Sequence, residues 1–190
     1  MDRIPTPSQT AGPFFHLGLT TTRSVAEIAD AKAQGEHLTL ICRVFDGEGN
    51  ALNDAMIEIW QADAEGRYNH PDDPQNKLCD PHCAGFGRMA TDENGVCVFE
   101  TIKPGRVLAN DGGLQAPHLN LSVFARGVLK RLATRLYFSG DPSNPGDPVL
   151  SLVPPNRRET LMAHPDPARP GAWRFDVHLS GNRETVFFDI

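Results

Sequence analysis

The sequence predicts an all-β protein: an antiparallel β-sandwich with an ordered N-terminal arm, one or two short helices and long loops. Short apolar segments with alternating side chains recur along the 190 residues, and 17 glycines and 16 prolines separate them. At least seven such segments with turn signals between them are typical of a sandwich. Because the chain has no internal repeat and the length of one domain, we expect a single domain over 1–190. The arm and a short helix would occupy 1–35 and the sandwich core 36–190.

The expected strands follow one another in order along the chain. They are HLTLICRVF (37–45), AMIEIWQAD (55–63), VCVFETI (96–102), HLNLSVFARG (118–127), ATRLYF (133–138), AWRFDVHLS (172–180) and ETVFFDI (184–190). The first strand ends at a strong turn signal, DGEGN. In the segment 172–180 the alternation is regular, and Trp173, Phe175, Val177 and Leu179 are expected to face inward.

Two segments favour short helices. Residues 24–35 begin with Ser24 as a candidate N-cap, carry Glu27 at the capping-box position and end at Gly35. Residues 156–164 are the second candidate.

Two further segments are expected to be ordered without being strands. Residues 1–23 are rich in Pro and Gly but contain Phe14, Phe15 and Leu17, so we expect an arm that packs on another surface. The connection 64–88 is long for a compact domain. Loops of this length are usually functional or form an interface.

Composition argues against nucleic-acid and membrane partners. The formal net charge is −6 and the 18 Lys and Arg are scattered, so we expect no nucleic-acid partner. No apolar run approaches the roughly 20 residues of a membrane span. The first 15 residues lack the pattern of a secretory signal, so we expect a cytoplasmic protein.

The four cysteines fit that expectation. Cys42 and Cys97 lie in apolar, strand-like runs, where free cysteine behaves as a small buried hydrophobe. Cys79, His82 and Cys83 lie close together in CDPHC, which invites a zinc interpretation. A second ligand pair at zinc-finger spacing is missing, so we favour reduced thiols.

A candidate metal site can be started from the residue types but not completed. Tyr68 in the long loop and His118 on a strand are suitable donors, whereas a mononuclear site usually needs three or four. Tyr137 is expected to be a packed core residue.

The strand that carries His118 has one polar and one apolar face. Alternation places His118, Asn120, Ser122, Phe124 and Arg126 on the polar face. A solvated outer face would explain this without a function. Alternatively, Arg126 presents a guanidinium to an anionic ligand or to a partner's carboxylate.

Several segments together resemble a known family over nearly the whole chain. They are TPSQTAGPFFHLGL (6–19), VFDGEGNALNDAMIEIWQADAEGRY (44–68), FGRMATDENGVCVFETIKPG (86–105), APHLNLSVFARG (116–127), TRLYF (134–138), RRETL (157–161) and ETVFFDI (184–190). They resemble the intradiol ring-cleaving dioxygenases. The resemblance implies a β-sandwich core and an enzyme that inserts both atoms of O₂ between the hydroxyl-bearing carbons of a catechol. The metal would be a non-haem ferric ion held by two tyrosines and two histidines.

The ligand positions of the family are only half preserved. The first tyrosine matches Tyr68 and the first histidine matches His118, but Val107 and Asn120 stand at the other two positions. Gln115 replaces an arginine of the catalytic chains. Neither valine nor a neutral amide can supply the hard anionic charge that stabilises Fe(III). We therefore expect these four positions to be vestigial, and this chain to bind no metal alone.

The resemblance then points to the iron-free subunit of a two-chain member of the family. An obligate beta subunit would hold the Fe(III), and the arm and the 64–88 loop would be buried against it. The substrates would be O₂ and a small aromatic compound that carries a carboxylate.

The resemblance also places part of the substrate pocket on this chain. Its substrate-binding residues would be Arg126, Thr10, Ala11, Gly12 and Pro13.

Two alternatives stay open. One is a non-catalytic β-sandwich scaffold or binding module. The other is a self-sufficient metal enzyme that adds His70, Cys79 or Asp111 to Tyr68 and His118.

Overall fold

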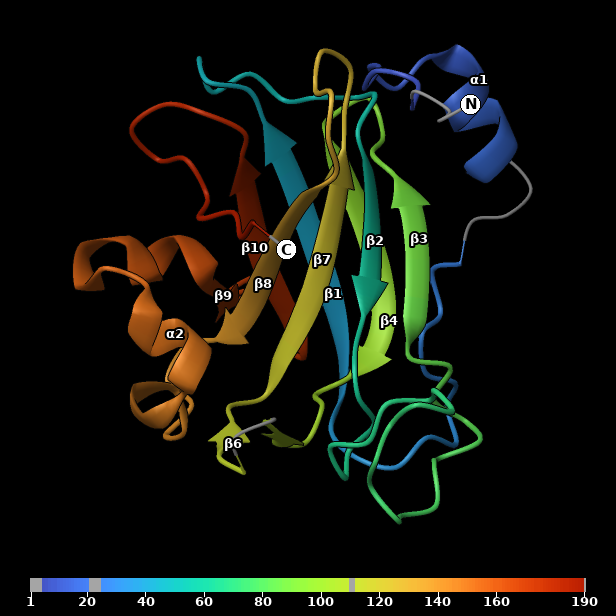
Figure 1. Ribbon diagram of the computed structural model, residues 1–190, viewed down its shortest axis with the longest axis vertical. Helices are drawn as coiled ribbons and strands as arrows, with labels where there is room; N and C mark the ends of the chain where they lie inside the picture. Colours follow the sequence, from blue (N-terminus) through green and yellow to red (C-terminus); the bar gives the residue numbers. More distant parts are fainter. Residues whose placement is uncertain (1–4, 21–24, 110–111, 190) are drawn as a thin grey trace.

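The computed structural model describes residues 5–20, 25–109 and 112–189, and in this part of the chain ten strands are found. Their bounds are β1 His37–Phe45, β2 Met56–Trp60, β3 Phe86–Ala90, β4 Val96–Ile102, β5 Val107–Leu108, β6 Leu114–Gln115, β7 His118–Phe124, β8 Leu132–Phe138, β9 Met162–Pro165 and β10 Ala172–His178. Eight of them form a sheet in the order β3-β2-β7-β8-β9-β10-β1-β4, and β5 pairs with β6 (Figure 1). The protein is mostly β, as the sequence predicts.

The large sheet is mixed rather than purely antiparallel. β1 pairs with β10, and β8 with β9, in parallel, while the other pairings are antiparallel. The sequence-based prediction of an antiparallel sheet is therefore wrong at two pairings. Parallel neighbours need a crossover connection. Residues 139–161 connect β8 to β9, and the long stretch 46–171 lies between β1 and β10.

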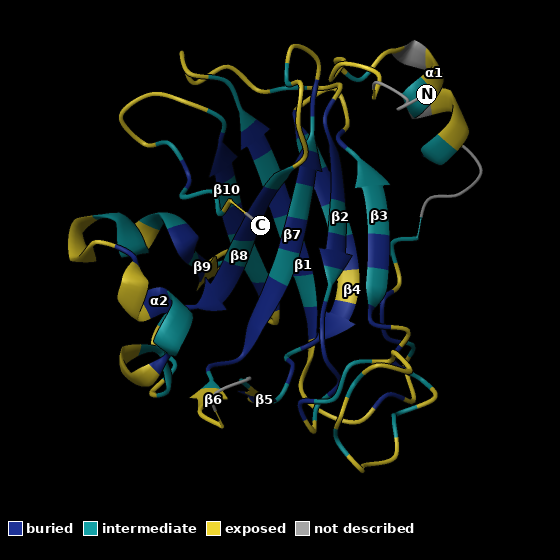
Figure 2. Ribbon diagram, in the orientation of Figure 1, coloured by how far each residue is buried: buried dark blue, intermediate teal, exposed yellow. Residues whose placement is uncertain are grey.

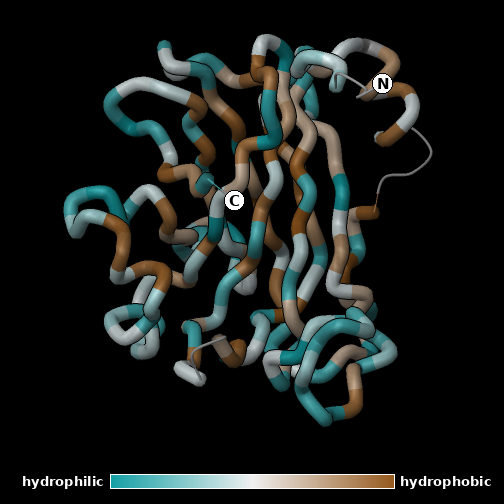
Figure 3. The backbone as a smooth tube through the Cα atoms, viewed as in Figure 1, coloured by the Kyte–Doolittle hydropathy of each residue, from teal (hydrophilic) through white to brown (hydrophobic). Residues whose placement is uncertain are grey.

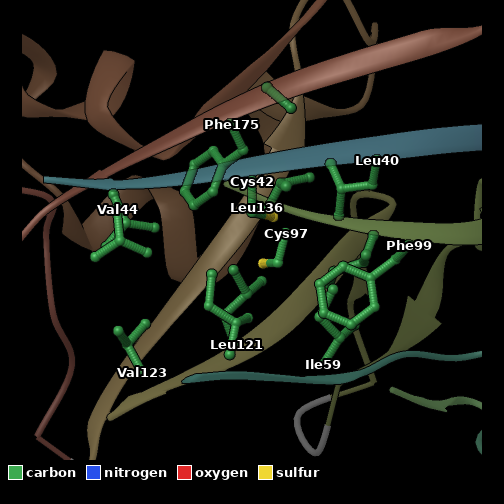
Figure 4. Packing of buried hydrophobic residues seen from close by; sticks show 14 of the residues in the cluster. Leu40, Cys42, Val44, Ile59, Cys97, Phe99, Leu121, Val123, Leu136 and Phe175 are labelled. Carbon is green, nitrogen blue, oxygen red and sulfur yellow. The ribbon is translucent and has the colours of Figure 1, made fainter. Parts of the chain in front are cut away.

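The sheet folds over so that its two halves share one core, as in a nearly closed barrel or sandwich (Figures 1 and 2). Alternate residues of β1 point inward, as its burial pattern shows directly. The core side chains come from both halves (Figure 4). They include Leu40, Cys42, Val44, Cys97, Phe99 and Phe175 on one side, and Ile59, Leu121, Val123 and Leu136 on the other.

Cys42 and Cys97 lie directly opposite each other in this core, on β1 and β4. A hydrogen bond with Cys97 and burial together raise the pKa of the Cys42 thiol, so it stays protonated. Their expected role as buried hydrophobes is confirmed.

The helix expected at 24–35 is absent, and an extended segment takes its place. Val25 bridges to Arg88 of β3, and Glu27 bridges to Glu100 of β4. Ile28, the residue after Glu27, is only 1% exposed and packs in the main core. Unpaired backbone groups along the edges of β3 and β4 thus override the local capping signals. Ser24, the expected N-cap, lies outside the described residues.

The N-terminal arm contains a helix that the sequence analysis missed, α1 (Pro13–Leu19) (Figure 1). The ring of Phe15 lies 5.4 Å from that of Phe124 at the end of β7. Thr10 Oγ1 accepts a hydrogen bond of 2.7 Å from the Gly127 amide. Phe14 is 84% exposed, and Leu17 is also largely exposed.

A second group of short helices lies beside β8: η1 (Asn144–Gly146), α2 (Pro148–Leu152) and η2 (Pro155–Leu161). The helix expected at 156–164 is therefore a 3₁₀ helix that ends where β9 begins. The prediction of a strand at 184–190 is wrong for residues 184–189, which the structure describes. Among them, Phe188 forms only an isolated bridge to Ala133.

The connection between β2 and β3 spans 61–85, slightly earlier than the expected 64–88. It is mainly hydrophilic, while hydrophobic residues follow the strands (Figure 3). The buried Asp63 organises its start, because Oδ1 accepts from the amides of Glu65 and Arg67. No described helix has the length and apolar character that a membrane span requires.

Candidate functional site

Tyr68 enters the site from the 61–85 loop and lies flat against a tryptophan. Its ring stacks on Trp60 of β2 with 5.8 Å between centroids and 11° between planes. Its amide donates to Asp73 Oδ2 at 2.9 Å, which fixes the local turn. Burial raises the pKa of the Tyr68 phenol above its usual 10, so the hydroxyl keeps its proton at neutral pH.

His118, the first residue of β7, is fully buried beside Tyr68. Its Nδ1–H donates to the Ala116 carbonyl at 2.8 Å, which leaves Nε2 as an acceptor. Nε2 lies 3.4 Å from the Tyr68 hydroxyl. Burial, with a smaller effect of the Arg135 charge, lowers the pKa of His118 to about 4. The imidazole is therefore neutral. Full burial also excludes the interpretation of this end of the strand as a solvated face.

Asn120 and Val107 occupy the two remaining ligand positions of the family. Asn120 Nδ2 donates to the Tyr68 hydroxyl at 3.0 Å. Val107 is buried on β5, opposite Gln115 of β6. The structure thus brings all four predicted positions into one region but supplies only two suitable donors.

These residues do not fit a ferric ion. An apolar side chain and an amide that donates to the phenol cannot replace the missing phenolate and imidazole. Among the described residues, no group of three or more His, Cys, Asp or Glu side chains could hold a metal.

The donors proposed as substitutes have other contacts. The Cys79 thiol donates to the Asp80 carbonyl at 3.8 Å. Of the other residues in CDPHC, His82 places Nδ1 2.8 Å from Asp30 Oδ2, and burial raises the pKa of the Cys83 thiol to about 11. His70 packs edge-on against Trp60. Asp111 lies outside the described residues.

Arg135 of β8 is a site residue that the sequence analysis missed. It pairs across the strands with Asn120, and its Nη1 donates to Gln115 Oε1 at 2.6 Å. Its position two residues before the buried Tyr137 was the available signal, because residues i and i+2 share a face. The segment ATRLYF by itself indicates only a packed strand.

Two adjoining hollows share Trp60 and Arg135 in their walls. One has a volume of about 340 Å³ and also touches Tyr68, Val107 and Gln115. The other, about 680 Å³, extends over β2, β7 and β8 toward Asn120 and is mainly apolar.

The other predicted residues gather at the opposite end of β7. Ala11, Gly12 and Arg126 line a hollow of about 530 Å³, and Thr10 is tied to this end through Gly127. Pro13 begins α1, and its side chain lies outside the described part. The seven residues of β7 separate this end from His118 by roughly 20 Å.

Arg126 already has a carboxylate neighbour within this chain. Its Nε lies 3.2 Å from Asp54 Oδ2, while its side chain remains 77% exposed. The guanidinium can therefore contact a further anion without breaking this pair.

Comparison with known proteins points to the family whose ligand positions were described above. A family model described as "Dioxygenase" matches residues 10–181. The protocatechuate 3,4-dioxygenase alpha chain of Burkholderia cepacia is 43% identical over 97% of both chains. That of Pseudomonas putida is 42% identical over 97% of this chain and 96% of its own. The beta chain from Burkholderia cepacia is 33% identical over 83% of this chain and 70% of its own.

Solved structures share the fold. The dioxygenase domain of a dioxygenase–carbohydrate-binding protein fusion from Streptomyces sp. SirexAA-E superposes with a TM-score of 0.62 at 26% identity, over 94% of this chain and 99% of that one. Hydroxyquinol 1,2-dioxygenase from Pseudomonas putida DLL-E4 reaches 0.64 at 21% identity, over 91% and 65%, which supports the fold alone. The chain belongs to the intradiol ring-cleavage dioxygenase family, whose members depend on iron.

Proposed function

We propose that this chain is the iron-free alpha subunit of a protocatechuate 3,4-dioxygenase. The alpha–beta complex cleaves the ring of 3,4-dihydroxybenzoate with O₂ between its two hydroxyl-bearing carbons and yields 3-carboxy-cis,cis-muconate. One observation carries the proposal: the chain matches the alpha chains over 97% of its length while Val107 and Asn120 stand where a metal site would need donors.

The partner beta subunit holds the ferric ion, and this chain contributes a wall of the substrate pocket. Arg126, Thr10, Ala11, Gly12 and Pro13 form that wall. In support, Arg126, Ala11 and Gly12 line one open hollow at this end of the sheet, and Thr10 is held at the same end by its hydrogen bond with Gly127. A guanidinium suits a benzoate carboxylate, and Gly12 lets backbone approach a flat ring closely.

The arm and the 64–88 loop contact the beta subunit over an obligate interface of roughly 2,000 Å² or more. The exposed Phe14 and Leu17 of α1 and the exposed Leu78 of the loop favour such an interface. The complex is cytoplasmic, and neither nucleic acid nor membrane takes part.

A reconstitution titration tests the proposal. The beta subunit at fixed concentration receives increasing amounts of this chain, and loss of 3,4-dihydroxybenzoate is followed. We expect no ring cleavage by this chain alone, and a rate that rises until the two chains are equimolar. Ring cleavage by the beta subunit that is unaffected by this chain would contradict the pocket role.

That last outcome would support the second candidate, a non-catalytic scaffold. The observation that favours it is the Arg126–Asp54 pair, because Arg126 then has a structural partner in its own chain.

A further inference from the structure

Arg135 is a partly buried cation without an ion-pair partner in the described part of the chain. Its Nη1 donates to Gln115 Oε1 and lies 3.5 Å from Tyr137 Oη. Its Nε and Nη2 have no protein hydrogen-bond partner among the described residues. A guanidinium in this state presents a planar pair of donors, which matches the two oxygens of a carboxylate.

The wall next to Arg135 suits a flat aromatic ring. Trp60 borders both hollows together with Arg135, and its ring is stacked on that of Tyr68, which also lines the smaller hollow. Val107 and Leu108 add apolar surface to the smaller hollow, whose 340 Å³ lies at the lower end of the roughly 300–1,000 Å³ typical of small-molecule sites.

The acidic residues at the rim leave the charge of Arg135 available. Asp73 accepts hydrogen bonds from the amides of Tyr68 and Gln75. The Asp72 side chain is 90% exposed and lies beside His70. In the larger hollow, Glu58 pairs with Arg88, and neither Glu58 nor Asp189 forms an ion pair with Arg135 in the described structure.

We infer that the smaller hollow, of about 340 Å³, binds a small aromatic carboxylate, with the carboxylate on Arg135 and the ring against Trp60. Because the chain lacks a set of metal donors, the ligand is held without being cleaved. The site goes beyond the proposed function, since binding requires neither iron nor the partner subunit.

Trp60 fluorescence provides the test. The chain has two tryptophans, so a Trp173→Phe variant leaves Trp60 as the reporter. The full chain is titrated with benzoate and, separately, with benzyl alcohol, which lacks the charge. We expect a saturable change with benzoate and a dissociation constant roughly tenfold or more lower than that of benzyl alcohol. Equal affinities, or no saturable change, would overturn the inference.

A matched pair of arginine variants locates the site. Arg135→Gln should weaken benzoate binding by roughly tenfold or more and leave benzyl alcohol unaffected. Arg183→Gln, the same change in the turn after β10 and away from both hollows, should alter neither. Equal effects of the two variants on benzoate would count against the assignment to Arg135.

A further measurement guards against variants that fail to fold. Ligand-observed NMR with the unmodified chain gives the same comparison of benzoate with benzyl alcohol and requires no substitution. If the proposed function failed, the reconstituted mixture would show no ring cleavage, while the benzoate titration of the lone chain would be unaffected.

Discussion

The hydroxyl of Tyr68 lies 3.4 Å from Nε2 of His118, although the two residues are 50 positions apart in the sequence. Asn120 donates to the same hydroxyl, and the Ala116 carbonyl fixes the histidine tautomer. The two residues expected at donor positions of the family thus stay in contact through hydrogen bonds, without donors at the other two positions. This relationship leads to predictions that separate a structural role from a catalytic one.

Tyr68→Phe should leave the ring cleavage of the alpha–beta complex unchanged. The variant keeps the stacking on Trp60 but removes the acceptor of Asn120, so we expect a loss of about 1 kcal/mol in the free energy of unfolding. Urea unfolding and a ring-cleavage assay check the two parts.

Tyr137→Phe is the matched control, because its hydroxyl donates to the fully buried Asp147 at 3.0 Å. It should cost about 1–3 kcal/mol and also spare activity. Loss of ring cleavage in Tyr68→Phe alone would show that this phenol takes part in catalysis.

His118 should make the chain less stable as the solution becomes acidic. Burial lowers its pKa in the folded state to about 4 from the ordinary 6.5. Between these pH values the unfolded chain binds the proton and the folded chain does not. The free energy of unfolding therefore falls as pH drops from 6.5 to 4, by roughly 3 kcal/mol in total.

Urea unfolding of the wild type and His118→Gln across this pH range isolates the effect, since the other titrating groups are common to both. The variant should lose stability less steeply than the wild type. Parallel curves would mean that His118 is protonated equally in the folded and unfolded states.

Arg126→Ala should lower the ring-cleavage activity of the alpha–beta complex while leaving the fold of this chain intact. The Arg126–Asp54 pair is exposed, so its loss should cost under about 1 kcal/mol of stability. If Arg126 faces the substrate carboxylate, kcat/KM for 3,4-dihydroxybenzoate should fall roughly tenfold or more. Asp54→Ala controls for the ion pair itself. Unchanged kinetics in Arg126→Ala would support the scaffold alternative.

Ile28→Ala should destabilise the chain strongly, although Ile28 belongs to no helix or strand. Its side chain is 1% exposed and packs so close to Gly87 that a Cβ there would meet it at 2.6 Å. We expect a cost of about 2–5 kcal/mol. Leu78→Ala, at a side chain that is 95% exposed, should change stability by less than about 0.5 kcal/mol. Equal costs in urea unfolding would show that the extended segment is not part of the core.

The strands with a regular alternation could be predicted from the sequence, because period-2 patterning reports which face is buried. β3 and β9 could not. Gly87 interrupts the pattern of β3, and β9 follows directly on η2. The prediction of a helix at 24–35 was wrong because this segment pairs with two sheet edges, β3 and β4. Both edges are distant in sequence, so local capping signals do not report them. The helix α1 is hard to predict because it has only seven residues and contains Gly18, although Pro13 at its first position is compatible with a helix start.

The sequence identified the positions that the structure brings together, because their residue types limit the choice. Tyr68 and His118 have side chains suited to a metal, and Asn120 and Val107 do not. Arg135 was missed because its place opposite Asn120 depends on the register of β7 and β8.

The iron content of the chain purified alone from cells supplied with iron tests the central claim most directly. The account predicts far less than one iron atom per chain and no visible absorption from tyrosinate bound to iron. The complex with the beta subunit should show both signals. Stoichiometric iron and colour in the lone chain would contradict the assignment of Tyr68, Val107, His118 and Asn120 as a site that has lost its metal.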